Sequence, residues 1–162
     1  MNQLTDNSEE IMVHGVAVAV AVDPDGPLAG VLLIGASGKG KSQTALSLIN
    51  ECRWQRTRLV ADDCVILRSD GESLLASPPE ALTGKVELRG FGPIEIPVQK
   101  NIVVKLVLDL DKSLARIPAI SSYEPTDDGP WAPLLPFSSM NSGSTSARVV
   151  LMLRSFLAGQ IP

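Results

Sequence analysis

The sequence has no excess of basic residues, since 14 Lys and Arg stand against 18 Asp and Glu, for a net charge of −4. Nucleic-acid binding needs a basic surface that neutralises phosphates, so this class of partner is not expected. Long hydrophobic runs are lacking as well. The apolar stretch from Val16 to Val22 is too short to span a bilayer. Acidic residues also stand near the N-terminus, where a signal peptide would carry positive charge. We therefore expect no membrane partner and a cytoplasmic protein.

Cysteine and histidine are scarce. Cys52 and Cys64 form neither a CxxC pair nor a His/Cys cluster, so we expect buried, reduced thiols rather than a metal site. His14 is the single histidine. By composition the chain is an ordinary globular protein, with 20% charged and 44% hydrophobic residues. Its 162 residues suit a single domain spanning 1–162 with a core of its own.

One glycine-rich stretch matches the phosphate-binding P-loop, in which two glycines four residues apart precede Lys and then Ser or Thr. The glycines let the backbone N–H groups approach phosphate oxygens at the start of a helix, where the dipole favours an anion. We predict a nucleotide site made by Gly35, Ala36, Ser37, Gly38, Lys39, Gly40, Lys41 and Ser42.

The flanks of this stretch fit as well. The aliphatic run 31–34 predicts a buried strand before the loop, and apolar residues at helical spacing from Ala45 to Cys52 predict a helix after it. In a P-loop of this type Lys41 reaches the β- and γ-phosphates, and the Ser42 hydroxyl binds Mg²⁺.

Two strands end in acidic residues, which are alternative candidates for binding the metal ion. The strand 58–61 ends in Asp62 and Asp63, and carboxylates at the edge of an open sheet suit Mg²⁺ binding and proton acceptance. The buried-strand pattern 103–108 ends in Asp109, which is the rival candidate for the metal-binding acid of a generic NTPase.

The remaining segments indicate a strand-rich chain. Valine alternates with alanine over 11–22, which predicts a strand with one face of larger residues and a hairpin into the P-loop strand. Residues 65–76 indicate a second hairpin, whose first strand extends the strand 58–61. The segment 84–97 is typical of an exposed strand and turn. Residues 1–10 are expected to be disordered, 121–146 to be an irregular loop, and 147–158 a final helix.

Four motifs occur in the order and spacing of the bacterial HPr kinase/phosphorylase catalytic domain, which this chain resembles from about His14 to Asp109. They are His14-Gly15, the P-loop, the strand that ends in Asp62-Asp63, and Val86-Glu87-Leu88-Arg89-Gly90-Phe91-Gly92. The last is the most specific to the family. The length resembles the short proteobacterial form that lacks the N-terminal domain.

The resemblance implies an α/β fold of the phosphoenolpyruvate-carboxykinase-like P-loop type, with a mixed, strand-rich sheet and few helices. It implies an ATP- and Mg²⁺-dependent kinase for a serine of HPr, the phosphocarrier of the sugar phosphotransferase system. It further implies the reverse phosphorolysis with inorganic phosphate, and a homo-oligomer of hexameric type.

The resemblance also assigns residues. Ser42 and Glu87 hold Mg²⁺, while Lys41 and His14 assist catalysis. One Asp of the pair acts as general base, and we favour Asp63 over Asp62. Glu87 and Arg89 alternate onto one face of their strand, and Arg89 offsets charge on the phosphoryl group or grips the protein substrate.

Two further hypotheses stay open. A generic small-molecule kinase or NTPase uses Asp109 rather than the Asp62-Asp63 pair. A nucleotide-sensing module binds ATP and transfers nothing, which is compatible with Gln43 standing where the family usually has Glu.

Overall fold

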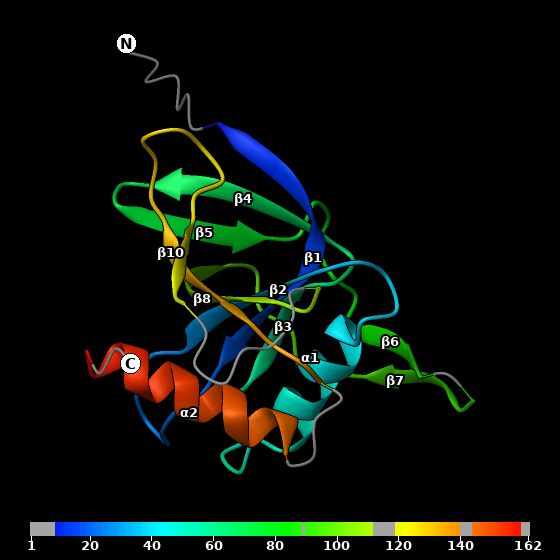
Figure 1. Cartoon of the computed structure of the whole chain (residues 1–162). Coiled ribbons are helices and arrows are strands. Elements are labelled where there is room, and N and C mark those ends of the chain that lie inside the picture. The colour runs from blue at the N-terminus through cyan, green and yellow to red at the C-terminus, as the bar shows by residue number, and fades with distance from the viewer. Residues whose placement is uncertain (1–8, 89, 112–118, 140–143, 160–162) are drawn as a thin grey trace.

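The computed structural model describes residues 9–88, 90–111, 119–139 and 144–159. Strands outnumber helices in this part of the chain (Figure 1). In chain order its elements are β1 (Glu10–Val20), β2 (Ala29–Ile34), α1 (Lys41–Asn50), β3 (Arg58–Ala61), β4 (Cys64–Asp70), β5 (Ser73–Ser77), β6 (Lys85–Leu88), β7 (Gly92–Glu95), β8 (Ile102–Asp109), β9 (Ser121–Tyr123), β10 (Ala132–Pro136) and α2 (Thr145–Leu157).

Eight of these strands form one mixed sheet. Its order is β2-β1-β4-β5-β8-β10-β9, with β3 paired to β1. Strand β8 also pairs with β2, so the path from β2 through β1, β4 and β5 closes on itself. The pairs β2–β8 and β8–β10 are parallel, and the others are antiparallel. The predicted α/β, strand-rich architecture is therefore confirmed, as are the hairpins β1–β2 and β4–β5.

The alternation in β1 divides the core between the two faces of the sheet. Successive side chains of a strand point to opposite faces. Val16, Val18 and Val20 lie in one buried cluster with residues of α1 and α2. Ala17 and Ala19 lie in a second cluster with β4 and β5 residues. The sequence predicted one face of larger side chains, and the structure places this face beneath the helices.

Both helices pack on the same side of the sheet. Leu48 of α1 and Val149 and Leu153 of α2 are at most 2% exposed and belong to the cluster that contains the β1 valines. Figure 1 shows α2 running across α1 on this side of the molecule. This arrangement brings the start of α2 beside the end of the helix that follows the P-loop.

Two sequence-based predictions are wrong. The segment 121–146 is not wholly irregular, because it contains β9 and β10 and the start of α2. Strand β10 gains its partners from distant parts of the sequence: Leu134 pairs with Val107 of β8 in parallel register. Such pairing leaves no local periodicity in a proline-rich segment, so the pattern gave no strand signal.

The strand 58–61 also does not continue into 65–68. It ends at Ala61, and β4 begins at Cys64 and pairs with a different part of β1. The interruption is Asp63, whose φ is 67°, a value at which no regular strand continues. The predicted strand and turn at 84–97 is a separate two-stranded sheet, β6–β7.

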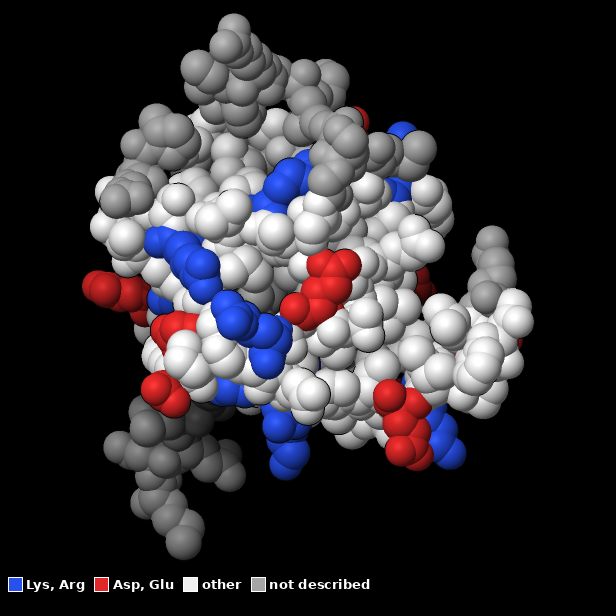
Figure 2. All heavy atoms as spheres, turned by 90° about the horizontal axis from the view of Figure 1, so that it is seen from below, with Lys and Arg blue, Asp and Glu red and all other residues white. Residues whose placement is uncertain are grey.

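The surface mixes charges of both signs. On the face shown in Figure 2, Lys and Arg side chains lie among Asp and Glu side chains. In the described ranges, neither helix has the length and apolar character that crossing a bilayer requires.

Candidate active site

The P-loop has the predicted sharp backbone turns. Gly35, Gly38 and Gly40 have φ of 136°, 83° and 92°, in the region that favours glycine. Gly40 is the N-cap of α1, and no side chain among the described residues caps this helix. The N–H groups of its first turn are thus free of a side-chain partner, as an anion site at a helix N-terminus requires.

Lys41 is folded into the loop. It is only 7% exposed, and its Nζ donates to the carbonyl oxygens of Gly35 and Ala36 at 2.6 and 3.0 Å. An ammonium group has three N–H donors, so one remains for a phosphate oxygen. The buried charge is held at the mouth of the loop by these two backbone groups.

Ser42 contacts the first of the paired acids. Its Oγ donates to Oδ1 of Asp62 at 3.0 Å. Asp62 follows β3, which runs antiparallel to β1, as does the P-loop strand β2. The carboxyl ends of β2 and β3 therefore lie on the same side of the sheet. The geometry joins the hydroxyl and the carboxylate that the sequence proposed for Mg²⁺ and phosphate chemistry.

Asp63 occupies a strained position beside the single histidine. The Cys64 N–H donates to the Asp62 carbonyl at 2.8 Å, so Asp63 lies at the centre of a three-residue turn. A non-glycine residue with φ near 67° is uncommon and is concentrated at functional sites. The turn leaves the Asp63 side chain 85% exposed, with Oδ1 at 3.4 Å from Nδ1 of His14.

His14 links Asp63 to the P-loop. Its Nε2 lies 3.4 Å from the Oγ of Ser37, while its Nδ1 faces Asp63. His14 sits on β1 next to the point where β4 pairs, opposite Cys64. Residues from β1, the P-loop and the turn after β3 thus converge, although they are separated in the sequence.

Asp109 takes a different position from that of the paired acids. It ends β8, which lies parallel to β2, with Asp109 opposite Ile34. Its Oδ1 accepts the N–H of Asp111 at 2.9 Å, and Oδ2 of Asp111 accepts the N–H of Ala36 at 2.9 Å. Asp111 therefore anchors the P-loop. The sequence reasoning missed this role, for which the only signal was an acid just beyond a buried strand.

The β6–β7 sheet lies next to the start of α1 (Figure 1). Val86 of β6 lines a small cleft together with Ser42 and Asp62. Glu87 is the following residue, exposed and opposite Pro93. Its assignment as a metal ligand stays a prediction. Arg89 lies outside the described residues.

A magnesium site here would depend partly on the nucleotide. Within the described part of the chain, no three His, Cys, Asp or Glu side chains gather closely enough to hold a metal ion by themselves. Mg²⁺ is commonly held by one or two protein oxygens, water and substrate phosphates. The Ser42 hydroxyl beside the Asp62 carboxylate fits that donor set.

Ser139 was also missed by the sequence reasoning. It follows β10, and its Oγ donates to the Lys39 carbonyl at 3.3 Å. A Cβ at Gly40 would lie 2.5 Å from this Oγ. The contact joins positions 100 residues apart, and it forms because Ser139, just after β10, reaches the loop.

We expect Gly40→Ala to lower the free energy of unfolding by more than Gly38→Ala. Both glycines have positive φ, which costs an alanine about 1–2 kcal/mol. Only Gly40 faces Ser139, whereas a Cβ at Gly38 meets no atom within 4 Å. Urea denaturation of the two variants measures the difference.

The double variant Gly40→Ala/Ser139→Ala separates the two causes. When the Ser139 hydroxyl is removed, the loss of unfolding free energy caused by Gly40→Ala should fall to that caused by Gly38→Ala. Equal costs for the two single variants would contradict the contact.

A comparison with models of known protein families shows which family this chain belongs to. The model of the HPr Serine kinase C-terminal domain matches residues 5–114 of this chain, a range that holds the P-loop, the acid pair and β6–β7. The chain belongs to this family.

Curated relatives agree. HPr kinase/phosphorylase of Bacillus licheniformis is 38% identical over 118 residues, which are 72% of this chain and 33% of the relative. That of Bacillus pumilus is 46% identical over 118 residues, with the same coverages. That of Clostridium acetobutylicum is 39% identical over 119 residues, which are 67% of this chain and 36% of the relative. The matched region thus spans about a third of each relative's length.

A solved structure shares the fold. The Hpr(Ser) kinase/phosphatase from Coxiella burnetii superposes with a TM-score of 0.71 at 20% sequence identity, covering 92% of each chain. The expected strand-rich architecture of the family is therefore confirmed for this member.

Proposed function

We propose that the protein is an ATP-dependent serine protein kinase that acts on the phosphocarrier HPr. The observation that carries the proposal is the contact between Ser42 of the P-loop and Asp62, with Asp63 and His14 immediately beside it. The P-loop motif lies next to an exposed carboxylate, which supports a role for that carboxylate in accepting a proton. The names of the relatives, all HPr kinase/phosphorylases, supply the substrate class.

In this proposal the loop from Gly35 to Ser42 binds the phosphates of ATP, and Lys41 directs its remaining N–H toward them. Ser42, Asp62 and Glu87 hold Mg²⁺, which neutralises charge on the phosphates when bound. The Ser42–Asp62 hydrogen bond keeps the two oxygen donors close before any metal arrives.

Asp63 is the proposed general base. It accepts the proton of the HPr serine hydroxyl as the serine oxygen forms a bond to the γ-phosphorus and the bond to the bridging oxygen of ADP breaks. The strained turn holds the Asp63 carboxylate in the open, where a protein substrate can reach it. His14 orients the carboxylate and stabilises its charge.

The same residues suit the reverse reaction. An oxygen of inorganic phosphate forms a bond to the phosphorus of phosphoserine as the bond from that phosphorus to the serine oxygen breaks. Asp63 returns a proton to the serine oxygen, and pyrophosphate is the product. We propose this phosphorylase activity and a homo-hexameric assembly with the family resemblance as their support.

The decisive experiment is incubation with purified HPr, labelled ATP and Mg²⁺. Label on an HPr serine supports the proposed kinase. ATP hydrolysis without labelled HPr would favour a generic NTPase, and ATP binding without turnover would favour a nucleotide-sensing module.

Glu87→Gln should reduce transfer to HPr by at least about tenfold, which corresponds to about 1.4 kcal/mol. An ordinary exposed charge contributes only about 0–1 kcal/mol, so a loss of this size would indicate metal binding. Arg89→Ala is expected to cause a similar loss by removing charge compensation at the phosphoryl group.

Glu95→Gln is the matched control, because Glu95 is an exposed acid on the partner strand β7, opposite Lys85. It should retain the wild-type rate. A wild-type rate of transfer in both Glu87→Gln and Arg89→Ala would show that neither side chain takes part in the reaction.

A further inference from the structure

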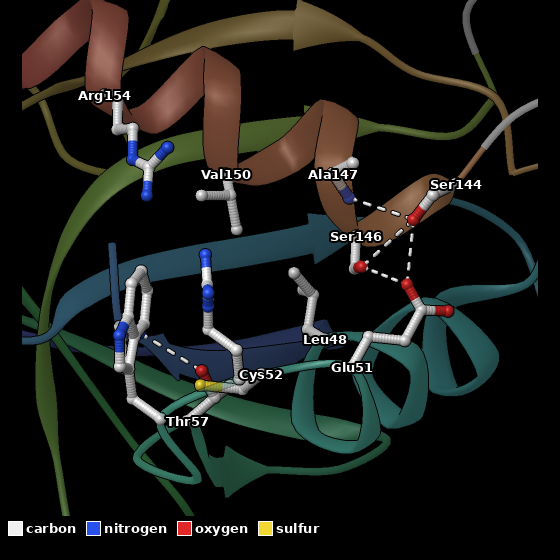
Figure 3. A pocket seen from close by; sticks show the side chains of 12 residues that line it. Leu48, Glu51, Cys52, Thr57, Ser144, Ser146, Ala147, Val150 and Arg154 are labelled. Atoms are coloured by element: carbon white, nitrogen blue, oxygen red, sulfur yellow. Dashed lines mark hydrogen bonds between the residues drawn. The ribbon is translucent and has the colours of Figure 1, made fainter. Parts of the chain in front are cut away.

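A cavity of about 320 Å³ lies at the opposite end of α1 from the P-loop. Residues from the end of α1, the turn that follows it and the facing side of α2 line it (Figure 3). It shares no lining residue with the P-loop or the acid pair. The proposed nucleotide site therefore does not account for this cavity.

One end of the cavity holds a carboxylate whose hydrogen bonds are made within the protein. The Glu51 carboxylate accepts hydrogen bonds from the Ser144 hydroxyl, at 2.8 Å, and from the Ser146 hydroxyl, at the N-terminus of α2. These bonds, that of Ser146 first, lower the pKa of Glu51. A carboxylate at a helix N-terminus is electrostatically favourable. Glu51 thus supplies the negative charge at this end of the cavity.

The other end carries two guanidinium groups. Arg53 and Arg154 lie 5.8 and 5.9 Å from the centroid of the Trp54 ring. The Nε of Arg154 donates to the Val22 carbonyl at 2.9 Å. Among the described residues its terminal N–H groups have no hydrogen-bond acceptor, which leaves them for a ligand. Hydrogen bonds from the backbone N–H groups of Gly26 and Asp25 lower the pKa of the Asp23 carboxyl, and the charge of Arg154 makes a smaller contribution in the same direction. Asp23 does not line the cavity.

The middle of the cavity is apolar. Figure 3 shows Leu48 rising from α1 and Val150 descending from α2, between Arg154 on one side and the Glu51–Ser144–Ser146 group on the other. Ligand sites combine such apolar walls with a few convergent polar groups. Here the charged groups that offer N–H donors to a ligand are the two guanidinium groups.

We propose that this cavity binds a small organic carboxylate. Its carboxylate group is held by Arg53 and Arg154, and its aromatic or aliphatic body lies against Trp54 and between Leu48 and Val150. Guanidinium groups pair with carboxylates through two parallel hydrogen bonds, which favours this class over neutral ligands. The inference does not depend on the proposed kinase function.

Cys52 is a built-in reporter of occupancy, because it lines the same cavity near Thr57 (Figure 3). Burial raises the pKa of the Cys52 thiol, but hydrogen bonds from the Thr57 hydroxyl and from nearby backbone N–H groups outweigh this and lower the pKa to about 7. The thiolate is the nucleophile, so Cys52 should react with iodoacetamide near neutral pH.

The test measures Cys52 alkylation in full-length protein with Cys64→Ser, so that one thiol remains. Benzoate, benzamide and inorganic phosphate are the three probes. Benzoate should slow alkylation in a saturable way, about tenfold at ten times its Kd. Benzamide lacks the charge and phosphate lacks the apolar body, so both should protect far less.

Arg154→Gln and Arg53→Gln should each abolish protection by benzoate while Cys52 still reacts in the absence of probe. Arg68→Gln, on β4, removes a charge away from the cavity and should leave protection unchanged. If Arg154→Gln does not fold, Arg53→Gln decides alone. Equal protection by benzoate and benzamide, no protection by benzoate, or full protection in Arg53→Gln would overturn the proposal.

Discussion

Asp63→Asn is expected to abolish phosphoryl transfer to HPr, with a loss of about 10²–10⁴-fold, while the nucleotide still binds. An amide cannot take up the serine proton, so the proposed general base is removed. The backbone should be preserved, because Asn tolerates the positive φ of 67° that Asp63 adopts. Transfer of label to HPr and nucleotide affinity, both measured on the folded variant, separate the chemical step from binding.

The matched control is Asp109→Asn, which changes the rival acid at the end of β8. Its carboxylate bonds the Asp111 N–H rather than Ser42, so transfer should fall far less than in Asp63→Asn. An inactive Asp109→Asn together with an active Asp63→Asn would establish the generic NTPase arrangement instead.

Lys41→Ala is expected to weaken Mg²⁺-dependent ATP binding by about tenfold to a hundredfold. A charge-assisted hydrogen bond to phosphate contributes about 1.5–3 kcal/mol. The variant also removes the two bonds from Nζ to the Gly35 and Ala36 carbonyls, so the loop loses its internal support. Titration calorimetry with ATP, with and without Mg²⁺, measures the change in affinity.

Lys105→Ala provides the comparison, because Lys105 is an exposed lysine within β8. It should bind ATP as the wild-type protein does. Unchanged affinity in a folded Lys41→Ala variant would contradict the assignment of the loop as a nucleotide site.

Local patterns were sufficient wherever neighbouring residues determine the backbone. The glycine spacing predicted the turns of the P-loop, and the Val–Ala alternation predicted that β1 has one face of larger residues. Helical spacing in the last segment predicted α2 to within two residues at its start. These features depend on steric limits and side-chain periodicity, which short stretches of sequence carry.

The sequence alone also brought His14, the P-loop and the Asp62-Asp63 pair forward as candidates, but it left open which acid meets the loop. Only the structure distinguishes them: Asp62 bonds Ser42, Asp63 faces His14, and Asp109 bonds the backbone of its own turn. The choice depends on a positive φ at Asp63 and on strand order, and neither has a periodic signature.

Contacts between distant segments could not be predicted from the sequence. Strand β10 forms because β8 offers it an edge, β9 pairs in turn with β10, and Ser139 meets the P-loop because it lies just after β10. The cavity that contains Cys52 likewise arises where the ends of two helices face each other. The motifs thus indicated the family, whereas long-range pairing and packing decided which side chains lie together.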